Sequence, residues 1–236
     1  MLNETFYLDG VDARSFGIHL QGPIEFSEAV PIVEAQTIPG RNGDLIWVTG
    51  SYENRSGSAR CFCLRKNVEI DIGSAGRFLM GKKGYRRLET SDDPDHYWMA
   101  RVENSPRINQ RLRTLAPFEI NFDCKPQRFV KAGKNVIDFD TNGSIFNRYG
   151  QTALPLIVVY GHGRGKLTIG DCVVDITEID GMLYLDSETQ NCYNDNGNKN
   201  MNINAPAFPT LPDGRTPVAF SGGIDRVEIT PRWWEL

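Results

Sequence analysis

The sequence predicts a mainly β protein with two domains, and three observations support this fold class. Glycine (23 residues) and proline (13 residues) interrupt the chain at short intervals, and few windows keep a helical period beyond two turns. Several segments alternate or cluster β-branched and aromatic residues, as strands do. A polar, glycine-containing stretch begins after residue 129. We therefore expect a β domain over residues 1–130 and a β-sandwich over residues 131–236.

The N-terminal half predicts short strands and one short helix. Residues 6–20 predict two strands around a turn that contains glycine. Residues 38–64 predict a turn, a strand, a polar loop and another strand, with a hairpin-type turn at Asn42–Gly43. Ser74 is the expected N-cap of a short helix with Phe78, Leu79 and Tyr85 on its apolar face. Residues 96–103 and 118–129 predict two further strands.

In the C-terminal half, strands and turns alternate at the spacing of a β-sandwich. A polar connection over residues 130–155 precedes the first strong strand, near residues 154–161. The glycine-rich segment Gly161–Thr168 lacks the spacing of a P-loop and of a dinucleotide-binding fingerprint. We expect this segment to be a hairpin turn between two strands.

The charge of the chain argues against general nucleic-acid binding. The net charge is −4 and the pI is about 5.5, so phosphate backbones are not attracted over the whole surface. Residues 1–130 hold 17 basic and 17 acidic residues, whereas residues 77–113 hold nine basic and five acidic ones. This locally basic region is either a solvated, salt-bridged surface or a contact with an acidic partner.

Hydropathy predicts neither a membrane-spanning helix nor a Sec signal peptide. The mean hydropathy is −0.39, and the longest wholly apolar runs, such as residues 156–159, are far shorter than the about 20 residues that a spanning helix needs. The first ten residues contain no basic n-region and no apolar h-region.

The cysteines predict reduced thiols that are mostly buried. Cys61 and Cys63 lie two residues apart in a predicted strand and therefore share a face. Cys124, Cys172 and Cys192 are isolated, and with three scattered histidines the spacing of a zinc site is missing. Such thiols fit folding in a cytoplasm.

No motif predicts catalysis, so we expect no catalytic, metal-binding or cofactor-binding residue. The loop Asn194–Asn200 lacks the acidic first ligand and the final glutamate of an EF-hand. Asp92–Asp93 and Asp138–Asp140 contain the paired carboxylates that glycoside hydrolysis requires. Their loop composition favours surface turns instead.

Four segments of the chain, in order, resemble the distal tail protein (Dit) family of long-tailed siphophages and their prophages. They contain Ser-Phe-Gly near the start, Pro-Gly-Arg-Asn-Gly-Asp-Leu at residues 39–45, a Lys-Pro-Gln-Arg-Phe step that ends at Phe129, and a closing Pro-Arg-Trp-Trp at residues 231–234. The matching segments are residues 6–20, 38–58, 118–129 and 183–234. The similarity extends over nearly the entire chain.

The resemblance implies a tail-tube-like N-terminal β domain with a short helix, which forms a hexameric ring, and a galectin-like C-terminal β-sandwich. It implies a structural virion protein, the hub of the tail tip or baseplate, and not an enzyme. The implied partners are further copies of the chain, the tail tube protein, the tail tip protein and receptor-binding or baseplate proteins, with no nucleic acid and no membrane. The implied location is the virion tail, after assembly in the host cytoplasm.

The resemblance places the ring-forming fold in residues 1–130. The dense and balanced charge of this half also suits a repeated contact between different patches of neighbouring subunits. The candidate basic residues are Arg86, Arg87, Arg111 and Arg113, and the candidate acidic residues are Asp92, Asp93 and Asp95. If these groups meet across subunits, molar salt is expected to loosen the hexamer.

The alternative function is a glycan-binding module for host adsorption, because galectin-like sandwiches are lectins in other settings. Lectin sites stack a sugar on an aromatic ring flanked by polar or basic side chains. The candidate groups are Tyr160 with His162 and Arg164, and Trp233 and Trp234 with Arg232.

Overall fold

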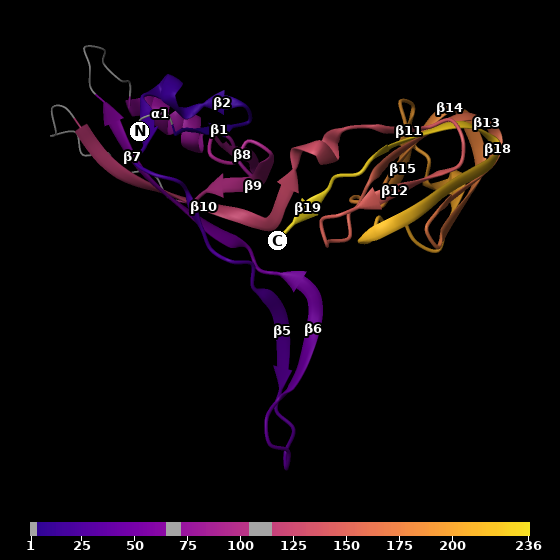
Figure 1. The fold of residues 1–236 in the computed structure, drawn as a ribbon, viewed down its shortest axis with the longest axis horizontal. Coiled ribbons are helices and arrows are strands. Elements are labelled where there is room, and N and C mark those ends of the chain that lie inside the picture. The colour runs from indigo at the N-terminus through magenta and orange to yellow at the C-terminus, as the bar shows by residue number, and fades with distance from the viewer. Residues whose placement is uncertain (1–3, 65–71, 104–114) are drawn as a thin grey trace. The chain divides into compact units, whose positions relative to one another are not determined.

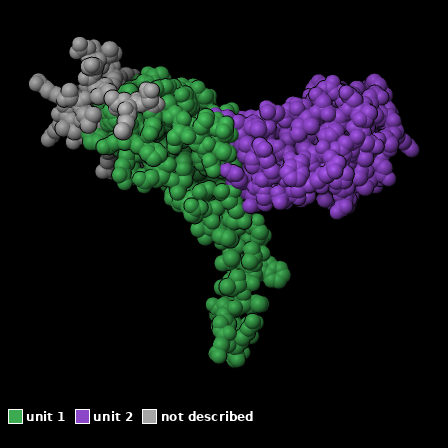
Figure 2. Space-filling view, viewed as in Figure 1, with its two compact units in different colours: residues 1–128, 236 green, residues 129–235 purple. Residues whose placement is uncertain are grey.

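The computed structural model describes residues 4–64, 72–103 and 115–236, and the chain is mainly β, as predicted (Figure 1). It divides into two compact units (Figure 2). Unit 1 comprises residues 1–128 with Leu236, and unit 2 comprises residues 129–235. Within the described ranges, no helix has the length and apolar character that crossing a membrane requires.

Unit 1 contains an antiparallel sheet, one α-helix and a separate two-stranded hairpin. The main sheet has the strand order β2-β1-β8-β9-β10-β7-β3, and β4 also pairs with β7. Among the strands of the described residues, β5 and β6 pair only with each other. The elements are β1 (Phe6–Leu8), β2 (Val11–Asp12), the 3-10 helix η1 (Ala13–Phe16), β3 (Ile18–Leu20), β4 (Glu25–Phe26), β5 (Pro31–Gln36), β6 (Leu45–Tyr52), β7 (Arg55–Leu64), α1 (Ile72–Met80), β8 (Arg86–Thr90), β9 (His96–Val102) and β10 (Leu115–Val130).

The core of unit 1 is formed by the inward side chains of the sheet and by the apolar face of α1. Phe6 of β1 meets Phe122 of β10 edge-on, with ring centroids 5.8 Å apart. Phe78 of α1 stacks on Phe16 of η1 at 4.4 Å. Cys61 and Cys63 share the inner face of β7, as predicted, and both are buried. The core therefore joins strands that are distant in sequence.

The predicted short helix is confirmed, but its N-cap is wrong. Helix α1 begins at Ile72, so Ser74 lies inside it. Ala75, Phe78 and Leu79 lie within the helix at the i, i+3, i+4 spacing and form its buried face. Tyr85 lies beyond the end of the helix, after Gly84, whose φ is 86°.

Unit 2 is built from strands with the order β11-β18-β13-β14-β15-β16, with β12 also paired to β18 and β17 also paired to β14. The elements are η2 (Lys131–Lys134), β11 (Ile137–Phe139), β12 (Gly143–Asn147), β13 (Leu156–Ile169), β14 (Cys172–Asp186), β15 (Asn191–Asn194), β16 (Gly197–Asn198), η3 (Asn200–Asn202), β17 (Ile203–Asn204), β18 (Gly214–Thr230) and β19 (Trp234–Glu235).

The predicted polar connection over residues 130–155 contains two strands, β11 and β12, so this prediction is wrong. Both strands pair with β18. Phe139 and Ile145 are buried in the core of unit 2. The apolar residues of β11 and β12 are too few, and too widely separated by Asp, Asn and Gly, to give a clear strand signal.

Three long strands form both layers of the sandwich in unit 2. The C-terminal part of β18 pairs with β11, whereas its N-terminal part pairs with β12. Ile157 and Val159 near the start of β13 and Leu167 and Ile169 near its end are buried in one common core. A single strand can place both ends in one core only if it bends over that core, as β13 does in Figure 1.

The bend lies at Gly161–Gly165, and the prediction of a hairpin turn there is wrong, because β13 continues through it. The pairing of β13 with β14 shifts register between Gly163 and Gly165. The backbones of β13 and β18 approach so closely that a Cβ on Gly161 would lie 1.9 Å from the carbonyl oxygen of Gly223. Glycines mark such close approaches as well as turns, and the sequence pattern does not distinguish the two.

The chain enters and leaves unit 2 through segments that lie side by side. Val130 N donates to Trp233 O at 2.9 Å, and Arg232 N donates to Gly133 O at 2.8 Å. A Cβ on Gly133 would lie 2.3 Å from Trp233 N. Arg232 also forms two hydrogen bonds to the Asp186 carboxylate, at 2.7 and 3.1 Å.

Candidate functional site

The β5–β6 hairpin carries the largest group of exposed apolar side chains in the described residues. Eight of the sixteen exposed large hydrophobic residues lie between positions 30 and 48. Trp47 is 69% exposed, Val48 63% and Ile46 62%. Residues 37–44 connect β5 to β6, and the hydrogen-bonded turn in this connection is the one in which Arg41 N donates to Ile38 O at 3.1 Å. Asn42–Gly43, where the sequence predicts the turn, forms a bend beside it, and Gly40 and Gly43 have φ values of 84° and 80°.

Both faces of the hairpin are apolar. Residues Leu45, Ile46, Trp47 and Val48 follow one another in β6, and successive side chains of a strand point to opposite faces. A two-stranded ribbon alone is marginally stable in water, and soluble monomers rarely expose large contiguous apolar patches. The hairpin therefore has the character of an interaction surface.

The root of the hairpin is tied to unit 1 by polar contacts. Arg55 Nε donates to Ser27 O at 2.6 Å, and Ser56 N donates to Ser27 Oγ at 3.0 Å. On the other side, Asn54 Nδ2 donates to Asp123 Oδ1 at 2.9 Å. The strands are thus exposed, while the segments that lead into and out of them are fixed.

The predicted basic contact residues have different environments. Arg86 is buried, with Nε 3.0 Å from Asp9 Oδ2. Arg87 lies over the ring of Tyr97, and its Nε is 2.8 Å from Glu89 Oε1. Arg111 and Arg113 lie outside the described residues. Internal partners make Arg86 and Arg87 weak candidates for an intersubunit contact.

The predicted acidic contact residues also have different environments. Asp93 accepts from Arg128 Nη2 at 2.6 Å, and its other oxygen is 2.7 Å from His96 Nδ1. Asp92 and Asp95 are exposed and remain available on the surface. The β8–β9 turn therefore offers Asp92 and Asp95, and not Asp93, to a partner.

Asp9 is the partner of the buried Arg86, and its own side chain is 31% exposed. Its ion pair predicts an acid-dependent loss of stability. Burial raises the pKa of Asp9, but hydrogen bonds from Lys82, Arg86 and the Arg87 backbone prevail and lower the pKa from 3.8 to about 2. A carboxyl whose pKa is lower in the folded state stabilises the fold above its unfolded pKa, and this contribution is lost as the pH falls through the folded pKa.

We expect Asp9→Asn to destabilise unit 1 at pH 7 by about 1 kcal/mol, because it removes the charge from these hydrogen bonds. The difference from the parent protein should shrink between pH 4 and pH 2, as measured by urea unfolding. Asparagine tolerates the positive φ of 54° at this position, so backbone strain does not contribute. A difference that stays constant over this pH range would contradict the prediction.

The candidate glycan-stacking groups of unit 2 are largely occupied. The Arg226 guanidinium lies 5.4 Å from the ring centroid of Tyr160. Trp233 is buried, and Trp234 Nε1 donates to Thr152 O at 3.0 Å. Arg232 is bound to Asp186, as described above. His162 and Arg164 are exposed in the bend of β13.

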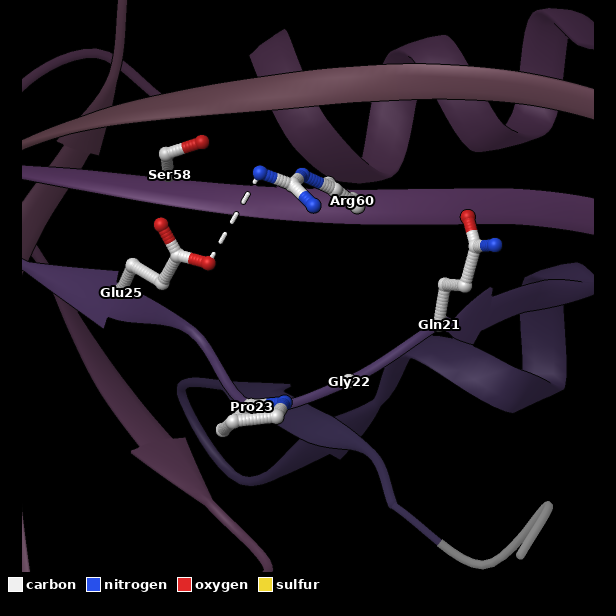
Figure 3. Close-up of a pocket in the computed structure, with 6 residues that line it drawn as sticks. All are labelled: Gln21, Gly22, Pro23, Glu25, Ser58 and Arg60. Carbon is white, nitrogen blue, oxygen red and sulfur yellow. Dashed lines mark ion pairs between the residues drawn. The ribbon is translucent and has the colours of Figure 1, made fainter.

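A small pocket of about 310 Å³ opens beside the edge of β7 (Figure 3). It lies where the chain between β3 and β4 leaves β7 at Gly22 and Pro23. Arg60 and Glu25 form an ion pair of 3.8 Å across it, and both side chains are more than 70% exposed. Exposed pairs of this kind contribute little binding energy.

The described residues contain no group of three or more His, Cys, Asp or Glu side chains that could hold a metal ion. All five cysteines are free thiols, and four are buried, as the sequence predicts. Burial raises the pKa of Cys61 and Cys124 to about 12 and that of Cys192 to about 11. These thiols are therefore protonated and poor nucleophiles at neutral pH.

Comparisons with known proteins identify the fold. No family model matches the sequence, and no curated protein matches it. The structure is similar to the crystal structure of SPP1 Dit (gp 19.1), described as a paradigm of the hub adsorption apparatus in phages that infect Gram-positive bacteria. The TM-score is 0.74 at 15% sequence identity, over 96% of this chain and 97% of that chain. The chain thus has the two-domain β fold of Dit.

Proposed function

We propose that this chain is a structural protein of a phage tail, the hub of the tail tip or baseplate, and that it has no enzymatic activity. Its fold matches that of SPP1 Dit over nearly the full length of both chains. Fold similarity alone does not determine function, so the proposal depends on a second observation. That observation is the exposed apolar hairpin β5–β6, which suits assembly into a larger particle.

The hairpin supports a ring built by unit 1. A protruding patch and a different receiving patch make a head-to-tail contact, and such contacts close into a ring when the rotation between subunits fits. Six copies are proposed from the family resemblance. Both the hairpin and the charge-balanced sheet belong to unit 1, so residues 1–130 are proposed as the ring-forming domain and residues 131–236 as the galectin-like sandwich.

The proposed partners are the tail tube protein, the tail tip protein and receptor-binding or baseplate proteins, in the tail of the virion. The proposal includes no cofactor, nucleic acid or membrane. Assembly in the host cytoplasm fits the free thiols. The lectin alternative is not pursued, because Trp233 is buried and the Arg226 guanidinium already lies over the ring of Tyr160.

The test is the assembly state of the full chain, measured by light scattering and negative-stain imaging at low and at molar salt. We expect six-membered rings that persist in molar salt, because apolar burial is not screened by ions. Rings that dissociate as salt rises would instead favour the charge pairs predicted from the sequence. A protein that stays monomeric both alone and with its tail partners would contradict the proposal.

A further inference from the structure

A second pocket of unit 1, about 480 Å³ in volume, lies at the root of the hairpin. Phe26 and Glu28, which precede β5, and Arg55, which follows β6, contribute to its wall. Trp98 of β9 and Arg128 of β10 also line it. It differs from the pocket of Figure 3 in containing buried, incompletely bonded donors.

Arg55 is a buried cation with too few acceptors. Its side chain is only 8% exposed, and its one hydrogen bond among the described residues runs from Nε to Ser27 O. The nearest carboxylate oxygen belongs to Glu28, 4.0 Å from Nη2, and the Glu28 side chain is 96% exposed. The two Nη atoms are not among the enclosed atoms that lack a partner, so water reaches them through the pocket. A charged acceptor that replaces this water would form stronger hydrogen bonds.

Trp98 supplies a second unsatisfied donor. The residue is 5% exposed, and its indole Nε1 has no hydrogen-bond partner in the described parts of the chain. Its ring stacks on Phe26 with centroids 4.3 Å apart, and the Arg128 guanidinium lies 5.6 Å from its centroid. The indole is therefore held in place, and its N–H is left without an acceptor.

The other polar groups that line the pocket do not satisfy these donors. Leu236, the last residue of the chain, also lines it, and it forms no hydrogen bond to Arg55 or Trp98 within the described residues. Asp93 is bound to Arg128 and His96. Asp92 is exposed, and Glu28 reaches Arg55 only at the limit of an ion pair. In the pocket of Figure 3, by contrast, Arg60 and its partner Glu25 are both exposed to solvent, so neither depends on a ligand.

We propose that the pocket at the hairpin root binds a carboxylate, the side chain of an acidic residue that a partner protein inserts there. The two Nη groups of Arg55 form a fork that matches both oxygens of a carboxylate. The rings of Phe26 and Trp98 provide an apolar wall for the methylene groups. The Trp98 N–H is fully enclosed, so its signal reports on the pocket although the N–H does not donate to the ligand. This inference does not depend on the ring.

The experiment follows the four indole N–H signals of the full chain by NMR, with Trp98 assigned through Trp98→Phe. The probe is N-acetyl-glutamate methylamide, which carries one carboxylate, and the control probe is its glutamine analogue, both at constant salt. We expect a saturable shift confined to the Trp98 signal, with the glutamine analogue binding at least about tenfold more weakly.

Variants of the full chain separate the pocket from general effects. Arg55→Lys should weaken binding of the glutamate probe at least about tenfold, because lysine cannot offer the fork. Arg60→Lys, the matched control on the same strand, should leave it unchanged. Glu28→Gln should tighten it by removing a nearby negative charge. Glu28 is exposed, so Glu28→Gln should fold normally. This variant therefore tests whether the glutamate probe binds beside Arg55 even if Arg55→Lys fails to fold.

Three outcomes would overturn the proposal. Equal shifts from the glutamate and glutamine probes, or no saturable shift of Trp98, would show that water satisfies the Nη donors of Arg55. Inorganic phosphate that binds as tightly as the glutamate probe would show a general anion site instead of a carboxylate pocket.

Discussion

Alanine at Gly161 is expected to destabilise unit 2 by about 4 kcal/mol. The new Cβ would lie 1.9 Å from the carbonyl oxygen of Gly223, and the φ of 154° is one that residues with a Cβ rarely adopt. The position of this Cβ is fixed by the backbone of β13, and the Gly223 oxygen belongs to the backbone of the paired strand β18, so neither atom can rotate away. The cost comes from separating two strands that form both layers of the sandwich.

The matched control is Gly163→Ala, two residues further along β13. Its φ is also positive, at 78°, but a Cβ there meets nothing within 4 Å. This variant should lose only the cost of the backbone conformation, about 1–2 kcal/mol. Urea unfolding of both proteins, followed by near-ultraviolet circular dichroism, measures the difference. Equal losses for the two alanines would show that the close approach does not limit the fold.

Replacing Trp47 and Val48 together by aspartate is expected to abolish self-assembly and leave folding unchanged. Both side chains are more than 60% exposed and belong to no buried core cluster. Burying a tryptophan and a valine in an interface contributes several kcal/mol, and each 1.4 kcal/mol is tenfold in affinity. We expect association to weaken about 100-fold or more, measured by analytical ultracentrifugation against an unchanged thermal unfolding curve.

Phe146 and Met201 of unit 2 provide the control for this result. They are 65% and 93% exposed, as accessible as the residues of the hairpin. Aspartate at both positions removes exposed apolar surface without touching β5–β6, so assembly should persist. Loss of assembly in this control, with assembly retained in the hairpin variant, would assign the contact to unit 2.

The sequence could predict the hairpin turn but not what the hairpin does. Asn42–Gly43 indicates a reversal of the chain through local backbone chemistry, and the chain does reverse there, although the connection is longer and its hydrogen-bonded turn lies at residues 38–41. Strand β5 was missed because Pro31, Glu34 and Gln36 have low strand propensity. The run of apolar residues in β6 is typical of a strand buried on both faces. Whether the side chains of β6 are exposed depends on the fold of the whole chain, so it cannot be predicted from the local sequence.

Polar partners were equally hard to predict, because they join residues that are distant along the chain. Asp9 binds Arg86, 77 residues later, and Asp93 binds Arg128, 35 residues later. Charge counts identified the dense charge of the N-terminal half but not which charges neutralise each other within it. The pocket at the hairpin root combines residues of β4, β7, β8, β9 and β10, so no local pattern indicates it.

The adjacent ends of unit 2 have a consequence for how such a chain can change. Val130 and Gly133 enter this unit hydrogen-bonded to Trp233 and Arg232, which leave it. A segment that replaces the residues between the entry and the exit of the chain needs only to have its two ends equally close to each other. Loop-closure cost grows slowly with the length inserted. The sandwich is therefore an exchangeable cassette, which another module with equally close ends could replace without redesign of unit 1.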